Sequence, residues 1–445
     1  MATCHCSDKW RNAEAGPPKP EITNMLDCIV IGAGAAGLAA ARRLQDKNAS
    51  FRLLEAKSHI GGRVVTDRVT LGAPIDLGAH WLHSPALNPL TPLVDRYSFH
   101  VKHGPEDFRV ARNGTILSGP EHTACFDYVD RCFDKIAAIG NGDRDCPVSE
   151  LFPLRGEWHD FFEANFIAKQ GVPSAQSSAL DFARYVWEGD DWPVLDGYGA
   201  LIARHAQGIA VELETPATRI AWGGKTGVTV ETPRGTLEAR AAIIAVSTGV
   251  LAAEIIRFSP SLPDWKLDAI ADLPLGSCNK VALGFTRNPF GDVDTMMLMP
   301  DLGPQQAVEF VIREGRRNIV TTMINGPFAK ALAAEGAHAA ADYALTQLAA
   351  IFGNAVKRCV TDRLVFADWD HDPWGAGCYA AARPGRYSAR AELARPIESR
   401  LFFAGEATHD CYMGDVHGAH LSGEAAADAA LTALRGRDFA STTAG

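Results

Sequence analysis

A glycine-rich segment near the N-terminus constrains the fold more than any other feature of the chain. Residues 26–31, LDCIVI, form an apolar run rich in β-branched residues, which predicts a buried strand. The segment GAGAAG follows at residues 32–37, and the stretch LAAARRLQDKN at residues 38–48 predicts a helix. A strand, a glycine turn and a helix in this order predict the first unit of a parallel α/β sheet that binds a dinucleotide.

The individual residues of this turn have separate expected roles. Gly32 permits the tight turn, Gly34 lets the backbone approach a pyrophosphate, and Gly37 lets the helix pack on the strand. The first helical turn, which includes Ala36, offers free N–H groups and the positive end of the helix dipole to the phosphates. Gly32, Gly34, Ala36 and Gly37 are therefore predicted cofactor contacts.

An acidic residue and a second glycine pair extend this site. Glu55 ends a second apolar run about twenty residues after the turn, where a ribose hydroxyl needs an acceptor. A parallel βαβ unit without a ligand is the alternative, but the coincidence of turn, context and acid favours dinucleotide binding. Residues 58–64, SHIGGRV, add Gly62 for close backbone approach and Arg63 to neutralise phosphate.

Two further stretches are long and distinctive. They are IDLGAHWLHSPALNP at residues 75–89 and FFAGEATHDCYMGDVHGAHLSGE at residues 402–424. Together with SHIGGRV they resemble motifs of the flavin-dependent amine oxidases, the family of monoamine and polyamine oxidases. The resemblance runs from about residue 26 to residue 434, and its motifs are most similar to those of polyamine oxidases.

This resemblance implies a cofactor and a reaction. The cofactor would be FAD rather than NAD, and the partners would be a small-molecule amine and O2. Hydride would pass from the α-carbon of the amine to flavin N5, the imine would hydrolyse, and O2 would reoxidise the flavin to give H2O2. The protein would supply orientation and a dry apolar wall, because the flavin carries the difficult chemistry.

The resemblance also implies which residues contact FAD. The strand-like LFFA and the turn at Gly405 place the carboxylate of Glu406 near ribityl or phosphate groups. The helix that follows would point its N-terminus at the pyrimidine oxygens of the flavin. The remaining implied contacts are Gly78, Ala79, His80, Trp81, Ala217, Trp369, Asp415, Val416 and Ala419.

Lys280 and His83 are the candidate catalytic residues. Lys280 stands out in the strand-like run SCNKVALGF and would hold a water against flavin N5, although a lysine on a solvated strand edge is the plainer interpretation. His83 would line the substrate channel and position or deprotonate the amine. A metal site from His80 and His83 would need further ligands at suitable spacing, and the sequence offers none.

Aromatic and acidic residues are the candidate substrate contacts. Tyr379 matches one wall of the aromatic cage of monoamine oxidases, and Trp374 lies close by in sequence. At the second wall the chain has Asp415, with Tyr412 as a partial replacement. Distal ammonium groups would bind the acidic loop of residues 188–191, which carries Glu188, Asp190 and Asp191, although a solvated loop is an equal alternative for it.

Cys378 has two interpretations. It occupies the position at which monoamine oxidases join a cysteine covalently to FAD. It also fits a small buried residue, and attachment would require a thiolate in the correct geometry. FAD is therefore expected, with covalent attachment through Cys378 left open.

Length and composition fit this interpretation. A chain of 445 residues is expected to form two domains, here a Rossmann-like α/β FAD-binding domain built from discontinuous segments and an α+β substrate-binding domain. The net charge of −10 argues against a nucleic-acid partner. The expected ranges are 24–90, 208–262 and 392–436 for FAD, 91–207 and 263–391 for substrate, 1–23 for a disordered leader, and 437–445 for a tail.

Within these ranges, residues 91–207 are expected to be largely helical, and residues 263–391 to mix strands with one helix at 328–352.

No apolar run reaches the roughly 18 residues of a membrane span, and the N-terminus lacks a signal peptide, which predicts a cytoplasmic protein without a membrane partner. The cysteines lack paired spacing, and Cys4 and Cys6 alone make a poor zinc site.

Two other activities remain open at this stage. An L-amino-acid oxidase of the same family would need an arginine for the substrate carboxylate, and Arg63 is assigned to FAD. A monoamine oxidase would need the aromatic cage that Asp415 interrupts. A flavin-binding scaffold without catalysis is the alternative from another class of protein.

Overall fold

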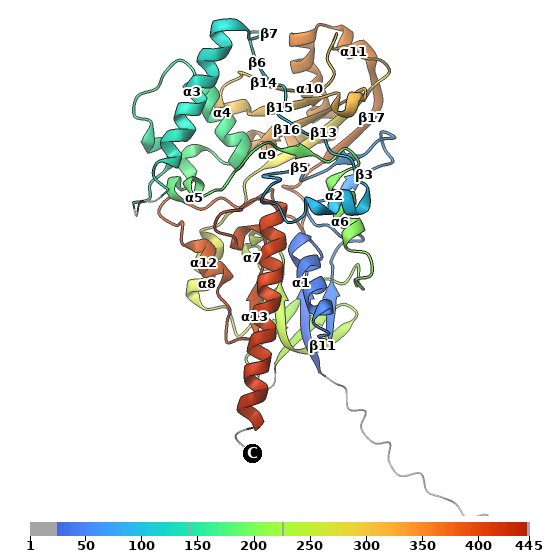
Figure 1. Ribbon diagram of the computed structural model, residues 1–445, viewed down its shortest axis with the longest axis vertical. Helices are drawn as coiled ribbons and strands as arrows, with labels where there is room; N and C mark the ends of the chain where they lie inside the picture. Colours follow the sequence, from blue (N-terminus) through green and yellow to red (C-terminus); the bar gives the residue numbers. More distant parts are fainter. Residues whose placement is uncertain (1–24, 141, 143, 225–226, 443–445) are drawn as a thin grey trace, which may run out of the picture.

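The computed structural model describes residues 25–140, 142, 144–224 and 227–442. The expected leader at 1–23, with Cys4 and Cys6, lies outside these residues. The described chain forms two seven-stranded sheets with helices packed on them, together with two small two-stranded sheets, and the α/β class is confirmed (Figure 1).

The first sheet contains seven strands that come from three distant parts of the sequence. Four of them are parallel neighbours in the order β2-β1-β11-β18. β1 begins and ends where the sequence predicts, because its apolar residues are buried between helices on both faces. The strands are β1 (Leu26–Ile31), β2 (Phe51–Leu54), β9 (Arg219–Ala221), β10 (Val228–Thr232), β11 (Gly235–Ile244), β12 (Arg257–Ser259) and β18 (Leu401–Phe403).

Two helices pack side by side on this sheet, α1 (Ala35–Asp46) and α13 (Val416–Thr442) (Figure 1). They approach closely because Gly423 of α13 has no side chain, and a Cβ there would lie 2.0 Å from the Ala36 carbonyl oxygen. α13 continues to Thr442, into the expected tail, and residues 443–445 lie outside the described chain.

The second sheet has the strand order β17-β13-β16-β15-β14-β6-β7. Alternate residues such as Val281, Phe310 and Val320 form an apolar core on one face with α9 and α10. The opposite set of residues is free to face a site. The strands are β6 (Phe108–Arg112), β7 (Thr115–Ile116), β13 (Cys278–Phe285), β14 (Met296–Pro300), β15 (Val308–Ile312), β16 (Ile319–Asn325) and β17 (Val360–Ala367).

The prediction of a single helix at residues 328–352 is wrong in one respect. The structure has two helices there, α9 (Gly326–Glu335) and α10 (Ala337–Phe352), which are separated by Gly336. Gly336 has a φ of +95°, a conformation that ends a helix and that glycine adopts at little cost. The alanine-rich composition on both sides hid this break.

Helices of residues 91–207 divide between the two sheets. α3 (Gly119–Ala137) and α4 (His159–Gln170) form an aromatic-rich core of their own beside the second sheet (Figure 1). In contrast, α2 (Pro92–Tyr97) and α6 (Tyr198–His205) bury Leu93 and Leu201 in the core of β1, α1 and α13. Core packing thus joins these two helices to the first sheet, although the sequence placed them with the second.

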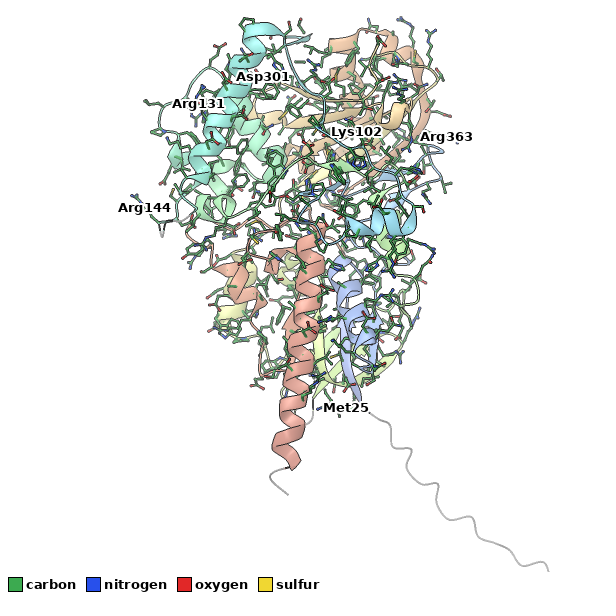
Figure 2. All side chains as sticks on the ribbon, in the orientation of Figure 1. Met25, Lys102, Arg131, Arg144, Asp301 and Arg363 are labelled. Carbon is green, nitrogen blue, oxygen red and sulfur yellow. The ribbon has the colours of Figure 1, made fainter. Side chains whose placement is uncertain are left out.

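The remaining elements are short. They are β3 (Thr66–Asp67), β4 (Ile75–Asp76), β5 (Trp81–Leu82), β8 (Trp192–Pro193), α5 (Ala179–Ala183), α7 (Thr248–Ala252), α8 (Asp264–Ala271), α11 (Ala355–Cys359), α12 (Ala389–Ala394), and the 3-10 turns η1 (Val148–Leu151), η2 (Ser174–Gln176), η3 (Pro304–Gln306), η4 (Glu314–Arg316) and η5 (Glu406–Thr408). Met25 and Arg363 lie toward opposite ends of the molecule (Figure 2). Among the described residues, no helix has the length and apolar character needed to cross a bilayer.

The contact between α1 and α13 gives a prediction about stability. Gly423→Ala should lower the free energy of unfolding by about 1–3 kcal/mol, because the new methyl group overlaps the Ala36 carbonyl and forces the helices apart. Gly436→Ala is the matched control in the same helix, since its added Cβ would have no atom within 4 Å apart from the adjacent backbone of the helix itself. Thermal melting of both variants checks this, and equal melting temperatures would contradict the close packing.

Candidate active site

The two predicted phosphate loops lie against each other beyond the end of β1. The N–H of Gly61 donates to the Ala33 carbonyl at 2.9 Å, and Gly34 and Gly61 pair as an isolated β-bridge. Glu55 fixes the same loop, because its carboxylate accepts the N–H groups of Ala33 at 2.7 Å and of Lys57 at 2.8 Å. The structure therefore joins the glycine turn, the acidic residue and the second glycine pair into one unit.

The beginning of α1 fits an anionic cofactor group. The helix begins at Ala35, and the preceding Gly34 has no side chain with which to cap it. The first turn contains no acidic residue either. Its N–H groups and its positive dipole end therefore suit an external anion such as a diphosphate.

Arg63 and Glu406 connect this unit to the C-terminal motif. The Arg63 guanidinium donates to the Glu406 carboxylate at 2.9 Å and also to the Cys378 carbonyl. The same carboxylate accepts the N–H groups of Ala380 and Gly414, each at 3.2 Å. Arg63 was expected to contact phosphate, and here its charge also balances a buried acid.

A small pocket lies at the carboxyl ends of β11 and β18. It is lined by Arg63, Ser247 and the residues from Phe403 to Thr408, which include Gly405 and Glu406. Cofactors of open α/β sheets bind outside the carboxyl ends of the strands. The pocket therefore lies at the carboxyl ends of the strands, where the sequence motifs predict a cofactor.

The turn at Asp76–Ala79 is held from three sides. The Lys280 ammonium donates to the Gly78 carbonyl at 2.6 Å, and the Trp369 indole N–H donates to the Leu77 carbonyl at 2.9 Å. The N–H of Ala79 donates to the Arg63 carbonyl at 3.1 Å. Lys280 and Trp369 were predicted from separate parts of the sequence, and the structure brings both to this turn.

Only glycine fits at the centre of this turn. A Cβ on Gly78 would lie 1.9 Å from the Arg63 carbonyl oxygen and 3.2 Å from the Trp369 ring. Real side chains do not tolerate such a contact with a backbone atom. Gly78 therefore allows Arg63, Trp369 and Lys280 to converge.

Lys280 does not lie on a solvated strand edge. It belongs to β13, which is paired on both sides by β16 and β17, and it is 7% exposed. Burial lowers the pKa of Lys280, and nearby Cys278 and Asp76 partly oppose that effect. A buried amine with a lowered pKa is a common feature of functional sites.

His80 and Trp81 each contact an acid that the sequence did not reveal. His80 Nε2 lies 2.7 Å from Glu314 Oε1, and the Trp81 indole N–H donates to Glu106 at 2.8 Å. Glu314 is 234 residues away in sequence and sits in the turn after β15. No local pattern distinguishes either glutamate, so spacing along the sequence could not have found them.

His83 lies between two of the predicted acids. Its Nδ1 is 2.8 Å from Asp191 Oδ1, and its Nε2 is 3.9 Å from Asp415 Oδ1. Asp415 also accepts a hydrogen bond from the Tyr185 hydroxyl at 2.8 Å. The structure thus brings Asp191 and Asp415 together with His83, and Tyr185 is an addition that sequence reasoning missed.

The charges of these three side chains are coupled. Burial lowers the pKa of His83, but the Asp415 and Asp191 carboxylates outweigh burial and raise it to about 9. Burial raises the pKa of Asp415 to about 6, against the opposing effect of His83. His83 therefore carries a proton at neutral pH, and with both acids ionised the group bears a net negative charge.

The rest of the predicted acidic loop is less involved. Glu188 and Asp190 are exposed, and the described contact of Glu188 is a backbone hydrogen bond to the Ser84 hydroxyl. The backbone N–H of Trp374 donates to the Asp372 carboxylate, which pairs with Lys57 beside the phosphate loops. The structure does not bring Trp374 into contact with the His83 group.

The two predicted tyrosines differ in their surroundings. The Tyr379 hydroxyl donates to the Ala168 carbonyl at 3.0 Å, at the end of α4. Tyr412 packs on His417, with ring centroids 4.5 Å apart. Val416 opens α13, and the N–H of Ala419 donates to the Asp415 carbonyl at 3.0 Å.

Ala217 and Cys378 are both buried. Ala217 belongs to a stretch anchored beside Glu55, whose carbonyl accepts the N–H of Thr215 at 2.8 Å. Cys378 lies between Arg63 and Tyr379, and burial raises the pKa of its thiol well above the ordinary value. The neutral thiol is therefore favoured at this position.

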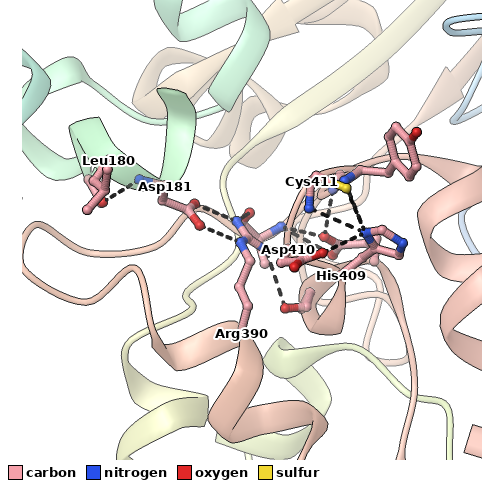
Figure 3. A network of polar contacts seen from close by, with 12 residues as sticks. Leu180, Asp181, Arg390, His409, Asp410 and Cys411 are labelled. Atoms are coloured by element: carbon pink, nitrogen blue, oxygen red, sulfur yellow. Dashed lines mark hydrogen bonds and ion pairs between the residues drawn. The ribbon is translucent and has the colours of Figure 1, made fainter. Parts of the chain in front are cut away.

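A buried ion pair holds the segment that follows Cys378 and Tyr379 (Figure 3). Arg390 of α12 binds both carboxylate oxygens of Asp181, at 2.7 and 2.8 Å, and donates to the Ala380 carbonyl at 2.9 Å. Arg390 is 1% exposed. The pair joins α5 to the strand-like segment that follows Tyr379.

His409, Asp410 and Cys411 appear beside this pair in Figure 3. Their potential ligand atoms lie within 4.8 Å of one another. However, His409 Nδ1 already accepts the N–H of Tyr412 at 3.1 Å, and Asp410 is 85% exposed. We therefore assign no metal to this group.

The ion pair gives a second prediction. Asp181→Asn should lower the free energy of unfolding by about 3–5 kcal/mol, because it leaves the buried Arg390 charge without its partner. Asp428→Asn breaks a bidentate pair with Arg43 that is exposed, and it should barely change stability. Denaturant unfolding checks this, and equal effects of the two substitutions would contradict a structural role for the buried pair.

Comparison with known proteins agrees with this geometry. The sequence profile of the family described as flavin containing amine oxidoreductase matches residues 35–138 and 139–431. Polyamine oxidase 4 of Oryza sativa subsp. japonica is 31% identical, over 90% of this chain and 87% of the relative. Polyamine oxidase 2 of Arabidopsis thaliana is 30% identical, over 91% of this chain and 88% of the relative.

A solved structure shows the same fold. Cyclohexylamine oxidase from Brevibacterium oxydans superimposes with a TM-score of 0.77, at 23% identity, over 92% of this chain and all of that chain. The family profile covers most of the sequence and confirms the expected resemblance, which in turn implies a flavin cofactor. The chain therefore belongs to the family of flavin-containing amine oxidoreductases.

Proposed function

We propose that this protein is an FAD-dependent oxidase of polyamines and related primary and secondary amines, with O2 as the electron acceptor. The observation that carries the proposal is the convergence of Lys280 and Trp369 on the Gly78 turn, next to the paired phosphate loops. We further propose that the first sheet with α1 and α13 binds FAD and that the second sheet forms the substrate side. The cytoplasmic location stays a prediction.

A bound flavin would supply the two-electron acceptor that amine oxidation requires. Gly32, Gly34, Gly62 and the N-terminus of α1 would hold its diphosphate, and Glu55 would hold a ribose. The buried Lys280 has a lowered pKa, so its amine gives up a proton more readily than an exposed lysine does. It is fixed beside Gly78 and can hold a water in place there.

The His83 group supports an amine rather than an amino acid as substrate. With its net negative charge the group attracts an ammonium ion and repels a carboxylate. Arg63, the cation that could bind a carboxylate, is paired with Glu406. Asp415 also stands where a monoamine oxidase would place its second cage ring, which favours a cationic chain over an aromatic amine.

We infer that the FAD is held without a bond to Cys378. A thioether would require a thiolate, and burial disfavours the charged form of this thiol. Acid precipitation of the purified yellow protein should therefore release free FAD into the supernatant. Flavin that stays with the precipitate would contradict this inference.

A panel of amines tests the proposed activity. Purified protein should show a flavin spectrum and should release H2O2 with spermine or spermidine, but not with L-amino acids. Turnover of L-amino acids alone would select the amino-acid oxidase instead. A flavin spectrum that no amine bleaches would select the scaffold.

Lys280→Met gives a prediction about the reductive step. The variant should bind FAD but should be reduced by amine about 100-fold more slowly, because the group that holds a water beside Gly78 is lost. Lys330→Met is the matched control, since Lys330 is exposed on α9. Anaerobic stopped-flow measurement of flavin bleaching checks this. An unchanged rate in a fully flavinated Lys280→Met protein removes Lys280 from the mechanism.

A further inference from the structure

Glu314 lies at the tip of the hairpin that joins β15 to β16, and its carboxylate reaches the His80 imidazole. Its Oε1 is 2.7 Å from His80 Nε2, and both side chains are largely buried. Burial raises the pKa of Glu314, but the electrostatic attraction and the hydrogen bond to His80 outweigh burial and lower it. Glu314 is therefore ionised at neutral pH. Because an ionised carboxylate has no proton to donate, His80 Nε2 is the donor.

The backbone of this hairpin tip is strained. Arg313 and Arg316 have φ angles of +55° and +62°, and Gly315 between them has a φ of +59°. Residues with a side chain occupy this left-handed region at a cost in free energy, and they remain there where surrounding contacts compensate for it. The Arg316 N–H donates to the Arg313 carbonyl at 2.7 Å, and the Arg313 N–H donates to the Ile319 carbonyl at 2.9 Å. The tip is thus fixed, and Glu314 with it.

Asp76 faces the other nitrogen of the same imidazole. Its Oδ2 lies 3.7 Å from His80 Nδ1, which has no hydrogen-bond partner among the described residues. The Asp76 carboxylate also accepts the N–H groups of Tyr198 and Gly199, at 2.9 and 3.2 Å. His80 is therefore held between an acid that the second sheet supplies and an acid that is itself fixed to the first turn of α6.

The turn that precedes His80 is the one that receives Lys280. The Lys280 ammonium donates to the Gly78 carbonyl at 2.6 Å and lies 3.4 Å from the Asp76 carbonyl. His80 follows this turn directly in sequence, so the orientation of its ring fixes where the turn ends. Within the described chain, the Glu314 carboxylate makes its hydrogen bond to His80 and none to the turn itself. Glu314 therefore reaches the turn through His80.

Charged groups from several elements face Lys280 and Glu314. Burial lowers the pKa of Lys280, and the groups that oppose this effect are Cys278, Asp76, Glu314 and Glu309. The groups that face Glu314 are His80, Lys280, Arg317 and Glu106. A loss of the Glu314 charge should therefore lower the pKa of Lys280 further.

We propose that Glu314 is a positioning residue for Lys280: it orients the His80 imidazole that ends the Gly78 turn, and it brings a negative charge near the Lys280 amine. The proposal rests on the proposed amine oxidase function and adds to it a residue that supports the reductive step. It also accounts for the strained hairpin tip, because strain of this kind is found where a side chain is held for function.

Nuclear magnetic resonance of protein with isotope-labelled histidine tests the contact independently of the reaction. The native holoenzyme should show a downfield imidazole N–H signal that exchanges slowly with water, and its absence in His80→Gln assigns it to His80. Glu314→Gln should move this signal upfield and speed its exchange, because a neutral amide is a weaker acceptor than a carboxylate. An unchanged His80 signal in Glu314→Gln would overturn the proposal.

Anaerobic flavin reduction by spermidine provides the second measurement. Glu314→Gln should lower the limiting rate about 10-fold and leave the dissociation constant of spermidine unchanged, because Lys280 is less well placed. It should also move to lower pH the part of the pH profile that Lys280→Met removes, since a carboxylate that raises the pKa of Lys280 is lost. A lower rate with an unmoved pH profile would show a merely structural role and would contradict the proposal.

Asp294→Asn is the matched control. Asp294 pairs with Arg316 at 2.7 Å beside the same hairpin tip, both side chains are exposed, and the substitution removes the same charge. The His80 signal, the limiting rate and the pH profile should stay as they are in the native protein. An equal effect of Asp294→Asn and Glu314→Gln would also overturn the proposal.

Three further outcomes keep the test decisive. If Glu314→Gln does not retain flavin, Glu314→Asp keeps the charge on a shorter side chain and should still move the His80 signal upfield, and an unmoved signal contradicts the proposal. Native protein that amines reduce, with Glu314→Gln indistinguishable from it, overturns the proposal but leaves amine oxidation intact. Native protein that no amine reduces refutes the proposed function, and the role of Glu314 falls with it.

Discussion

The hydrogen bond from the Lys280 ammonium to the Gly78 carbonyl connects the two halves of the candidate site. It joins a buried strand of the second sheet to a turn that also holds the Arg63 carbonyl and the Trp369 indole. A hydrogen bond in a dry environment is stronger than the same bond in water. The turn has no room for a Cβ at Gly78, and Lys280 binds the backbone carbonyl of this glycine.

Charge is distributed unevenly around this bond. His83 lies between Asp191 and Asp415 and remains protonated near neutral pH. Glu309 shares the sheet face of Lys280, and no hydrogen bond or ion pair joins its carboxylate to another of the described residues. The net negative charge of the His83 group favours the approach of a cationic amine.

The sequence predicted the local features well, because they depend on neighbouring residues. The strand, glycine turn and helix of residues 26–48 form a contiguous pattern, and the structure reproduces the strand with the same bounds. Gly336 breaks a helix that composition alone made continuous. Glu314 and Glu309 were not predicted, since an isolated acid in a strand or turn carries no signal until folding places Glu314 beside His80 and Glu309 on the sheet face of Lys280.

A crystal structure of the purified yellow protein would test the central claim most directly. The account predicts electron density for an isoalloxazine ring against the Gly78 turn, with the Lys280 amine on its reactive-nitrogen side and Trp369 and Tyr379 close to it. Density for a nicotinamide there, or for a flavin ring away from Lys280, would contradict the account.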